Sequence, residues 1–302
     1  MCIREEKDII RKIESEKESM VSERIIDTEL NKEYDVYLIN IDDKKYTIKE
    51  NYNGYESNIY ENLLSNKSIQ VHEYYGKFVD SNNKENIVIE YIKGNIFNNE
   101  NLDSYLELAK ELANIHKVFF NNNHINSNSA FLKNMNLRNL ELIKEAQRSK
   151  ELGKYNITED ILNKLKGIVK YMMSRPQTLI HRDLLPINIM KSNSGVKIID
   201  WESAAIGCYT QDIGRLLYDF RNSNGEYWVK KEYEGSILDI YYIEVSNNDF
   251  YTINRDEFEI DVQCSKIMNY AGIGLAHIVN GWDKTEWYRL NLENMIKGLE
   301  EV

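Results

Sequence analysis

The chain has 302 residues, of which 42% are hydrophobic, and its formal net charge at pH 7 is −11. This length allows one large domain or two lobes with a sizeable core, and the hydrophobic content is ordinary for a globular protein. The negative charge argues against a general affinity for nucleic acid phosphates, and no apolar run is long enough to span a membrane, so we expect neither partner.

The N-terminal stretch, MCIREEKDIIRKIESEKESM, is charged throughout. Such a stretch is neither a signal peptide nor a membrane anchor. We predict an exposed amphipathic helix over residues 1–24.

Four strands and one helix are predicted next. Residues 34–50, YDVYLINIDDKKYTIKE, have the pattern of a β-hairpin around an Asp-Asp turn, with Lys49 near the end of the second strand. Residues 54–66 have apolar side chains at helical spacing, and residues 71–80 and 86–94 have the pattern of two further strands.

The pattern becomes helical after Gly94. Residues 102–120 are strongly amphipathic, residues 121–129 are a polar loop, and most of the remainder is helical. Two short apolar strands, TLIH and VKIID, interrupt this half and flank a loop. We therefore predict an α+β fold with a small β-rich lobe, residues 1–93, and a larger, mostly helical lobe, residues 94–302.

The loop between the two short strands carries the chemistry. The run His181-Arg182-Asp183-Leu184, with Asn188 five residues after the aspartate, fits the H-R-D-L-x-x-x-N pattern of a catalytic loop. Phosphoryl transfer needs one carboxylate to hold the attacking hydroxyl, and an amide oxygen with a second carboxylate to hold Mg²⁺. Asp183, Asn188 and Asp200 supply that set, and Pro186 stiffens the loop between the first two.

This segment resembles the aminoglycoside phosphotransferase and choline kinase superfamily, whose members share the protein-kinase-like fold. The strand end Ile199-Asp200-Trp201-Glu202 is similar to the family's second signature, and the run DIGRLLYDF follows it. The resemblance spans roughly residues 30–220 and is most specific over residues 181–202. It implies a two-lobed kinase whose small antiparallel sheet, with one helix, binds the nucleotide.

The resemblance also implies a role for each residue of the loop. Asp183 would be the catalytic base, and Asn188 and Asp200 would bind Mg²⁺. Three further residues would support them: His181, Arg182 and Glu202. His181 would hold the loop by hydrogen bonds. Glu202 would contact the metal or a substrate amine, or would contact the metal ligands without binding the metal itself.

A second set implied by the resemblance would bind ATP or GTP. Lys49 would contact the phosphates and be held by an ion pair with Glu56, although Glu61 on the same predicted helix is the alternative partner. Backbone groups of three consecutive residues would receive the nucleotide base. They are Glu90, Tyr91 and Ile92.

Two departures from kinase patterns keep three functions open. The stretch TELNKEYDVYLIN, before the hairpin turn, contains no glycine where kinases place a glycine-rich phosphate loop. The run D-W-E leads almost directly into a helix, which argues against a protein substrate. We expect a small-molecule kinase; the alternative is a degenerate kinase fold with a binding or structural role, as in some spore-coat relatives, and a protein kinase is a third and weaker candidate.

The acceptor is expected among the C-terminal helices. The residues after Glu202 include 17 acidic and 9 basic side chains and so carry −8 of the total charge. A cationic acceptor such as an aminoglycoside would fit such a region, through carboxylates in residues 256–261 or at Asp283 and Glu286. Choline-like amines, sugars and amino-acid alcohols remain open alternatives, and the sequence gives no oligomeric state.

The three cysteines are odd in number and far apart, without metal-ligand or redox spacing. This indicates reduced thiols in a cytoplasmic protein. They are Cys2, Cys208 and Cys264.

Overall fold

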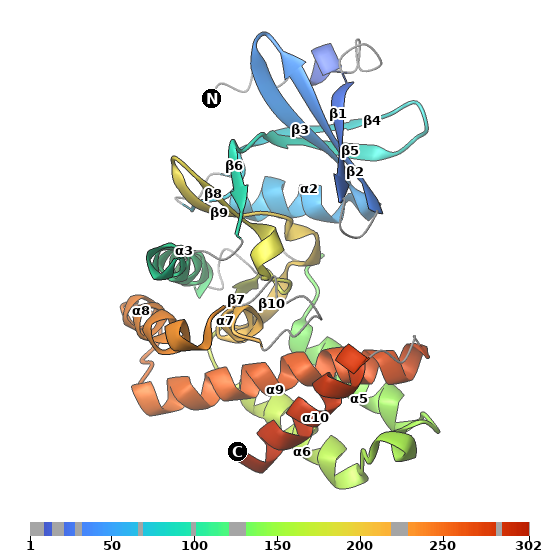
Figure 1. Cartoon of the computed structure of the whole chain (residues 1–302), viewed down its shortest axis with the longest axis vertical. Helices are drawn as coiled ribbons and strands as arrows, with labels where there is room; N and C mark the ends of the chain where they lie inside the picture. The colour runs from blue at the N-terminus through green and yellow to red at the C-terminus, as the bar shows by residue number, and fades with distance from the viewer. Residues whose placement is uncertain are drawn as a thin grey trace. The chain divides into compact units, whose positions relative to one another are not determined.

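The computed structural model describes residues 9–13, 21–27, 32–65, 69–97, 101–120, 131–218, 229–281 and 286–301. The chain divides into two compact units. The N-terminal unit comprises Met1–Asn95 and Met190–Glu202, and the C-terminal unit comprises Ile96–Ile189 and Ser203–Val302 (Figure 1).

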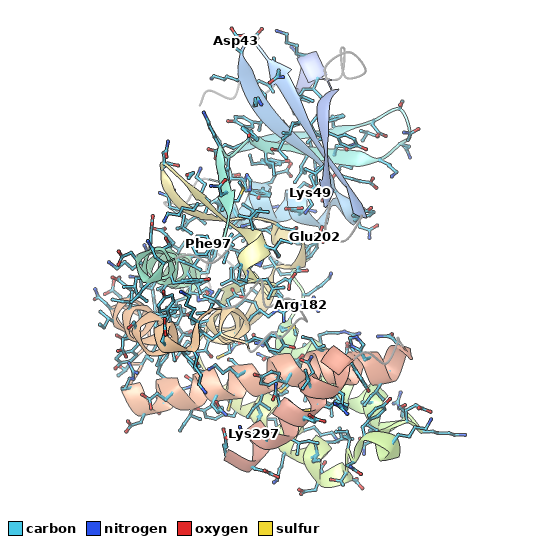
Figure 2. All side chains as sticks on the ribbon, in the orientation of Figure 1. Asp43, Lys49, Phe97, Arg182, Glu202 and Lys297 are labelled. Carbon is cyan, nitrogen blue, oxygen red and sulfur yellow. The ribbon has the colours of Figure 1, made fainter. Side chains whose placement is uncertain are left out.

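The N-terminal unit is built on an antiparallel sheet with the strand order β1-β2-β3-β5-β4. Its strands are β1 (Val21–Asp27), β2 (Lys32–Ile41), β3 (Lys44–Glu50), β4 (Tyr74–Val79) and β5 (Glu85–Glu90). The predicted hairpin is β2 and β3, with Asp43 at its tip (Figure 2). Both turn residues, Asp42 and Asp43, have a positive φ, which a tight two-residue hairpin requires and aspartate tolerates.

The predicted N-terminal helix is only partly correct. Residues 9–13 are helical, but residues 21–24 belong to β1, which pairs with β2. The helical residues are also not exposed on all sides, because Ile13 is fully buried in a core with Ile39 and Ile48. Pairing with a strand further along the chain outweighed the local helical pattern at residues 21–24.

The helix of this unit begins at the position predicted from the sequence. A turn η1 (Tyr52–Gly54) leads into α2 (Tyr55–Ile59), which continues as a π-helical turn η2 (Tyr60–Leu64). The Asn51 side chain accepts hydrogen bonds from the backbone N–H groups of Glu56 and Ser57. It satisfies donors that the first turn of a helix leaves open, and so fixes where α2 begins.

A second small sheet shifts the boundary between the units. It has the order β6-β8-β9 and consists of β6 (Gly94–Ile96), β8 (Ile189–Ser192) and β9 (Gly195–Ile198). Pairing with β6 brings residues 190–202 into the N-terminal unit, whereas the sequence assigned them to the helical lobe. The first boundary falls after Asn95 rather than after residue 93.

The C-terminal unit is mostly helical, as expected. Its helices are α3 (Leu102–Phe120), α5 (Met135–Gln147), α6 (Glu159–Met173), α7 (Gln211–Leu216), α8 (Glu234–Ser246), α9 (Arg255–Asn280) and α10 (Glu286–Glu301). A two-stranded antiparallel sheet joins β7 (Gln177–Ile180) to β10 (Ala205–Cys208). The short helical turns of this unit are η3 (Leu152–Tyr155), η4 (Pro186–Asn188) and η6 (Lys231–Tyr233), whereas η5 (Trp201–Ser203) belongs to the N-terminal unit through Trp201 and Glu202.

The long helix α9 shows how the sequence sets these elements. It begins at Asn254, whose side chain accepts from the N–H of Glu257 at 2.9 Å, and it ends at Gly281 in the left-handed region. Within the described ranges, no helix combines the length and the apolar character that crossing a membrane requires. The predicted loop 121–129 lies outside the described residues.

Candidate active site

Lys49 on β3 is the centre of a charged cluster in the N-terminal unit. Its Nζ lies 2.8 Å from Glu56 Oε2, 2.5 Å from Asp200 Oδ1 and 3.1 Å from Glu202 Oε2. Burial alone would lower the pKa of Lys49, but the three carboxylates outweigh it and raise this pKa well above its ordinary value. Lys49 is therefore held as an ammonium ion.

The structure decides between the two candidate partners of Lys49. Glu56 is 2% exposed and pairs with it, whereas Glu61 accepts a hydrogen bond from the Tyr74 hydroxyl at 2.7 Å and faces Lys77. Burial raises the pKa of Glu56 to about 7, and the charge of Lys49 offsets only part of that effect.

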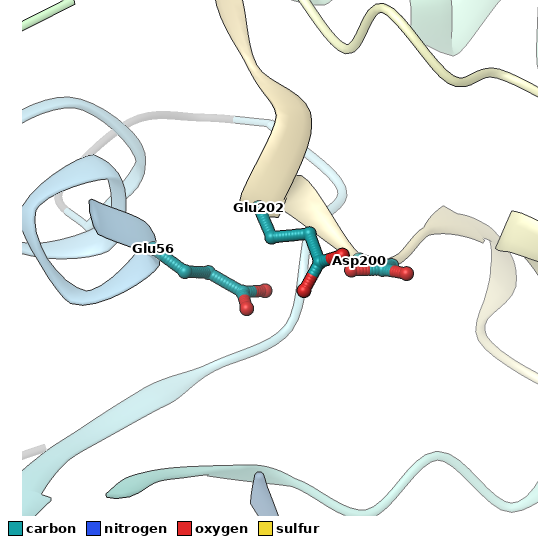
Figure 3. Close-up of side chains that lie close together, drawn as sticks. All are labelled: Glu56, Asp200 and Glu202. Carbon is teal, nitrogen blue, oxygen red and sulfur yellow. The ribbon is translucent and has the colours of Figure 1, made fainter. Parts of the chain in front are cut away.

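Oxygen atoms of Glu56, Asp200 and Glu202 lie within 4.8 Å of one another (Figure 3). With one lysine among three carboxylates, the group offers excess negative charge on hard oxygen atoms. Mg²⁺ prefers such ligands. Because Glu56 is buried and engaged by Lys49 and the Trp201 N–H, Asp200 and Glu202 are the carboxylates of this group that fit a magnesium site.

The turn that carries Asp200 is anchored by Trp201. Asp200 follows β9 with a φ of 65°, a left-handed conformation that is rare for a residue with a side chain. The indole of Trp201 is fully buried and donates to the carbonyl of Ile198, and its backbone N–H donates to Glu56 Oε1 at 3.2 Å. The bond to Glu56 connects the Asp200 turn directly to α2.

The catalytic-loop motif lies in the C-terminal unit. Pro186 begins the single turn η4, and this turn brings the side chain of Asn188 back to Asp183. Asn188 Nδ2 donates to the Asp183 carbonyl at 2.8 Å and to its carboxylate at 3.3 Å. On its other side the Asp183 carboxylate pairs with Arg215 at 2.9 Å.

Asp212 on α7 fixes the backbone at the start of this loop by hydrogen bonds. Its carboxylate accepts the backbone N–H groups of His181 at 2.6 Å and Arg182 at 2.8 Å, and lies 3.1 Å from His116 Nε2. Although burial would raise the pKa of Asp212, the hydrogen bonds and nearby histidines outweigh burial and lower it. Arg182 adopts a φ of 73°, and the bond to Asp212 holds this conformation in place.

Asp212 and Arg215 are further candidate site residues that the sequence did not single out, although both lie in the run DIGRLLYDF. The available signal was an acid and a base in the middle of an apolar helical segment. Buried charged side chains usually form ion pairs or hydrogen bonds, or have a functional role.

The backbone expected to receive the nucleotide base is only partly open. The N–H of Glu90 donates to the Glu73 carbonyl at 2.8 Å, and the carbonyl of Glu90 contacts His72 Nδ1 at 3.0 Å. For Tyr91 and Ile92, no backbone hydrogen bond forms within the ranges the structure describes. The backbone groups of Tyr91 and Ile92 are thus better candidates for binding the nucleotide base than those of Glu90.

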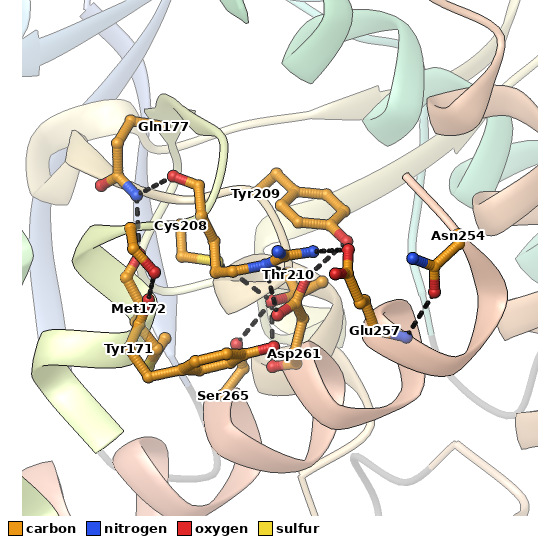
Figure 4. Close-up of polar contacts among 12 residues, drawn as sticks. Tyr171, Met172, Gln177, Cys208, Tyr209, Thr210, Asn254, Glu257, Asp261 and Ser265 are labelled. Atoms are coloured by element: carbon orange, nitrogen blue, oxygen red, sulfur yellow. Dashed lines mark hydrogen bonds and ion pairs between the residues drawn. The ribbon is translucent and has the colours of Figure 1, made fainter. Parts of the chain in front are cut away.

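Asp183 lines a cavity of about 470 Å³ within the C-terminal unit, formed with α5, α7 and α9. The acidic stretch 256–261 takes no part in its lining. Three of its four carboxylates pair with arginines outside that lining: Asp261 and Glu257 pair with Arg175 (Figure 4), and Glu259 pairs with Arg255. Asp283 lies outside the described residues, and Glu286 begins α10.

Comparisons with known proteins identify the family and the fold. A family model described as the phosphotransferase enzyme family matches residues 63–236. Protein LicA homolog from Mycoplasma capricolum subsp. capricolum (strain California kid) is 26% identical over 195 residues, 64% of this chain and 70% of that protein.

Solved structures that resemble the whole chain include two kinases. Choline kinase LicA from Streptococcus pneumoniae aligns with a TM-score of 0.64 and 18% identity, covering 99% of this chain and 100% of the other. The GDP and kanamycin complex of APH(2")-IIia aligns with a TM-score of 0.62 and 16% identity, covering 97% and 99%. The chain thus has the protein-kinase-like fold that the loop motif predicted.

Proposed function

The chain belongs to the phosphotransferase enzyme family, and on this premise we propose that it transfers the terminal phosphoryl group of ATP or GTP to a hydroxyl of a small molecule. The observation that carries the proposal is the Lys49 cluster, in which one lysine is paired with Glu56 and Asp200. A buried lysine–glutamate pair beside a metal-binding aspartate is what a kinase uses to hold nucleotide phosphates.

The residues of the chain divide the reaction between them. Lys49 binds phosphate oxygens, and Asp200 and Asn188 hold Mg²⁺, which when bound neutralises charge on the phosphates. Backbone groups of Tyr91 and Ile92 receive the base. Asp183 orients the acceptor hydroxyl and accepts its proton.

In the transfer step, the acceptor oxygen forms a bond to the terminal phosphorus. The bond between that phosphorus and its bridging oxygen breaks, and the nucleoside diphosphate leaves with the electron pair. The hydroxyl proton passes to the carboxylate of Asp183. Arg215 and Asn188 support this proposal, because they hold the Asp183 side chain on two sides before any substrate arrives.

A protein substrate is disfavoured by the connection after Asp200. The turn η5 leads at once into β10, and α7 begins at Gln211. The stretch between Asp200 and α7 is too short to form the long activation segment of a protein kinase. The non-catalytic alternative is motivated by the absence of glycine in residues 28–40, and the intact set of Lys49, Asp183 and Asp200 speaks against it.

The charge of the acceptor is the finer part of the proposal. APH(2")-IIia was solved with kanamycin, which makes a cationic acceptor a natural candidate. Three of the four carboxylates in residues 256–261, those of Glu257, Glu259 and Asp261, do not support it, since their partners are arginines of the same unit.

Thermal denaturation of the full chain with ATP or GTP, with and without Mg²⁺, tests nucleotide binding. We expect stabilisation that needs the metal, of about 3 kcal/mol when free nucleotide is roughly 100 times its Kd. No shift with either nucleotide would contradict the proposal, and a shift without any phosphoryl transfer would favour the non-catalytic alternative.

A further inference from the structure

His116 on α3 is a fully buried, titratable side chain that takes no direct part in the proposed reaction. Its ring contacts Asp212 of α7 and Tyr241 of α8. Resting on the proposed function, we infer that His116 is an imidazolium ion, with a proton on both ring nitrogens, and that it positions the catalytic loop through Asp212.

The hydroxyl of Tyr241 determines the proton on one ring nitrogen. This hydroxyl donates its single proton to the backbone carbonyl of Tyr209 at 2.8 Å, because a carbonyl oxygen can only accept. The same hydroxyl oxygen lies 2.6 Å from His116 Nδ1. Since its own proton is already used, Tyr241 accepts in this second bond, and Nδ1 therefore carries a proton.

Asp212 determines the proton on the other nitrogen. Its Oδ2 lies 3.1 Å from His116 Nε2, and its two oxygens accept the backbone N–H groups of His181 and Arg182. Such bonds stabilise an ionised carboxylate, and although burial would raise the pKa of Asp212, hydrogen bonds and the nearby histidines lower it. An ionised carboxylate can only accept, so Nε2 donates the second proton.

A neutral His116 ring would leave a buried group without its partner. If Nδ1 had no proton, the Tyr241 hydroxyl would donate to it, and the Tyr209 carbonyl would lose its donor. Both tyrosines are fully buried, and an unpaired polar group costs stability there. In the imidazolium arrangement these groups keep their partners, and the charge of the ring faces the opposite charge of Asp212.

The charge of His116 acts on the catalytic loop through Asp212. One backbone N–H that Asp212 accepts, at 2.8 Å, belongs to Arg182, the residue before the proposed base, Asp183. An imidazolium donor keeps Asp212 ionised and its oxygens directed at the loop backbone. It thereby supports the position of Asp183.

Two contacts connect His116 to further elements of the C-terminal unit. Thr178 Oγ1 donates to the His116 carbonyl at 2.8 Å and joins α3 to β7, the strand that leads into the catalytic loop. Tyr241 joins His116 to α8 (Figure 1). A substitution at Tyr241 should therefore affect the catalytic loop, although α8 is not part of that loop.

Nuclear magnetic resonance of the full chain with isotope-labelled histidine tests the charge of His116 without any substrate. The chain has five histidines, and the His116 signals are those that disappear in His116→Gln or shift in Tyr241→Phe. At neutral pH, where a histidine in water is mostly neutral, we expect two ring N–H signals from His116. In Tyr241→Phe the Nδ1 proton has no acceptor, and its signal should be lost.

Hydrogen exchange at the backbone amides of His181 and Arg182 tests the positioning role. His116→Gln replaces the ring by an uncharged amide and should speed exchange at both amides roughly 10-fold or more. The matched control is Tyr242→Phe on the same helix, which removes a hydroxyl that donates to the Ile253 carbonyl at 3.4 Å. It should leave exchange at both amides unchanged.

Rates of ADP formation from Mg·ATP, with water, glycerol, choline or kanamycin as the acceptor probe, separate positioning from binding. His116→Gln should lower kcat about 10- to 100-fold, as a small displacement of the base predicts, and leave the KM for Mg·ATP nearly unchanged. Tyr241→Phe should lower kcat less, and Tyr242→Phe should not change it.

A single ring N–H signal from His116 in the natural chain would overturn the inference, and so would unchanged amide exchange or an unchanged kcat in His116→Gln. The phosphotransferase proposal would stand in each case. Absence of ADP formation by the natural chain would instead contradict the proposed function, and the ring signals and amide exchange would still decide the charge and the positioning role of His116.

Discussion

At the scale of single residues, four side chains carry the charge of the Lys49 cluster. Lys49 neutralises one of three carboxylates, and the other two leave a surplus of negative charge. A divalent cation bound with nucleotide would offset that surplus. The cluster is therefore expected to bind nucleotide and metal together rather than either alone.

Asp200 and Asn188 should contribute unequally to metal binding. Asp200→Ala removes a charged ligand and should abolish the stabilisation that Mg·ATP gives over ATP alone, whereas Asn188→Ala removes a neutral amide and should only weaken it. Thermal shifts with and without Mg²⁺ measure both. A full Mg·ATP shift in the Asp200 variant would place the metal elsewhere.

Sequence reasoning identified this residue pattern but not its geometry. The spacing from Asp183 to Asn188 and Asp200 is a local signal, and the structure adds the partner of Lys49, because the choice of Glu56 over Glu61 depends on where α2 begins. Asp212 and Arg215 escaped notice because their roles depend on contacts with residues about thirty positions away in the sequence.

At the scale of elements, α7 supports the catalytic loop through one buried carboxylate. Asp212→Ala would leave two backbone N–H groups and His116 without their acceptor. We expect a loss of about 2–5 kcal/mol in the free energy of unfolding, measured by urea denaturation. Asp239→Ala, which breaks an exposed ion pair with Arg255, is the control and should cost less than about 1 kcal/mol. Equal losses in the two variants would contradict the supporting role of Asp212.

His72, in the segment before β4, should make the stability of the N-terminal unit depend on pH. His72 is buried and contacts the carbonyl of Glu90, and burial lowers its pKa from 6.5 to about 4. Below pH 6.5 the unfolded chain takes up a proton that the folded chain does not take up until about pH 4. The free energy of unfolding should therefore fall as pH falls through this range, by up to about 3 kcal/mol, and level off below it.

His72→Asn keeps a donor for Glu90 and removes the titrating ring. Urea denaturation at about pH 5 and about pH 7.5 should give a smaller difference in the free energy of unfolding for this variant than for the natural chain. If both chains lose the same stability on acidification, His72 is not the source of the effect.

The strand pairings of β1 and of the sheet β6-β8-β9 could not be predicted from the sequence. The β2–β3 hairpin could be predicted because its turn and its alternation are local. The position of residues 21–27 in a strand depends on pairing with β2, and the membership of residues 190–202 in the N-terminal unit depends on β6. Neither pairing leaves a local pattern, since register is set by the partner strand.

At the scale of the whole molecule, the central proposal is one phosphoryl transfer in which Lys49 and Asp200 bind the nucleotide and its metal and Asp183 is the base. Loss of the proposed base, Asp183, should therefore leave Mg·ATP binding intact and slow phosphoryl transfer.

The most direct measurement is ADP formation by the natural chain and by Asp183→Asn, with Mg·ATP and a panel of cationic, neutral and anionic hydroxyl compounds, alongside the Mg·ATP thermal shift of both proteins. We predict equal thermal shifts and a transfer rate that is about 10²- to 10⁴-fold lower in the variant, as loss of a positioned general base requires. Equal rates of ADP formation in the two proteins, or no Mg·ATP shift in either, would contradict the account.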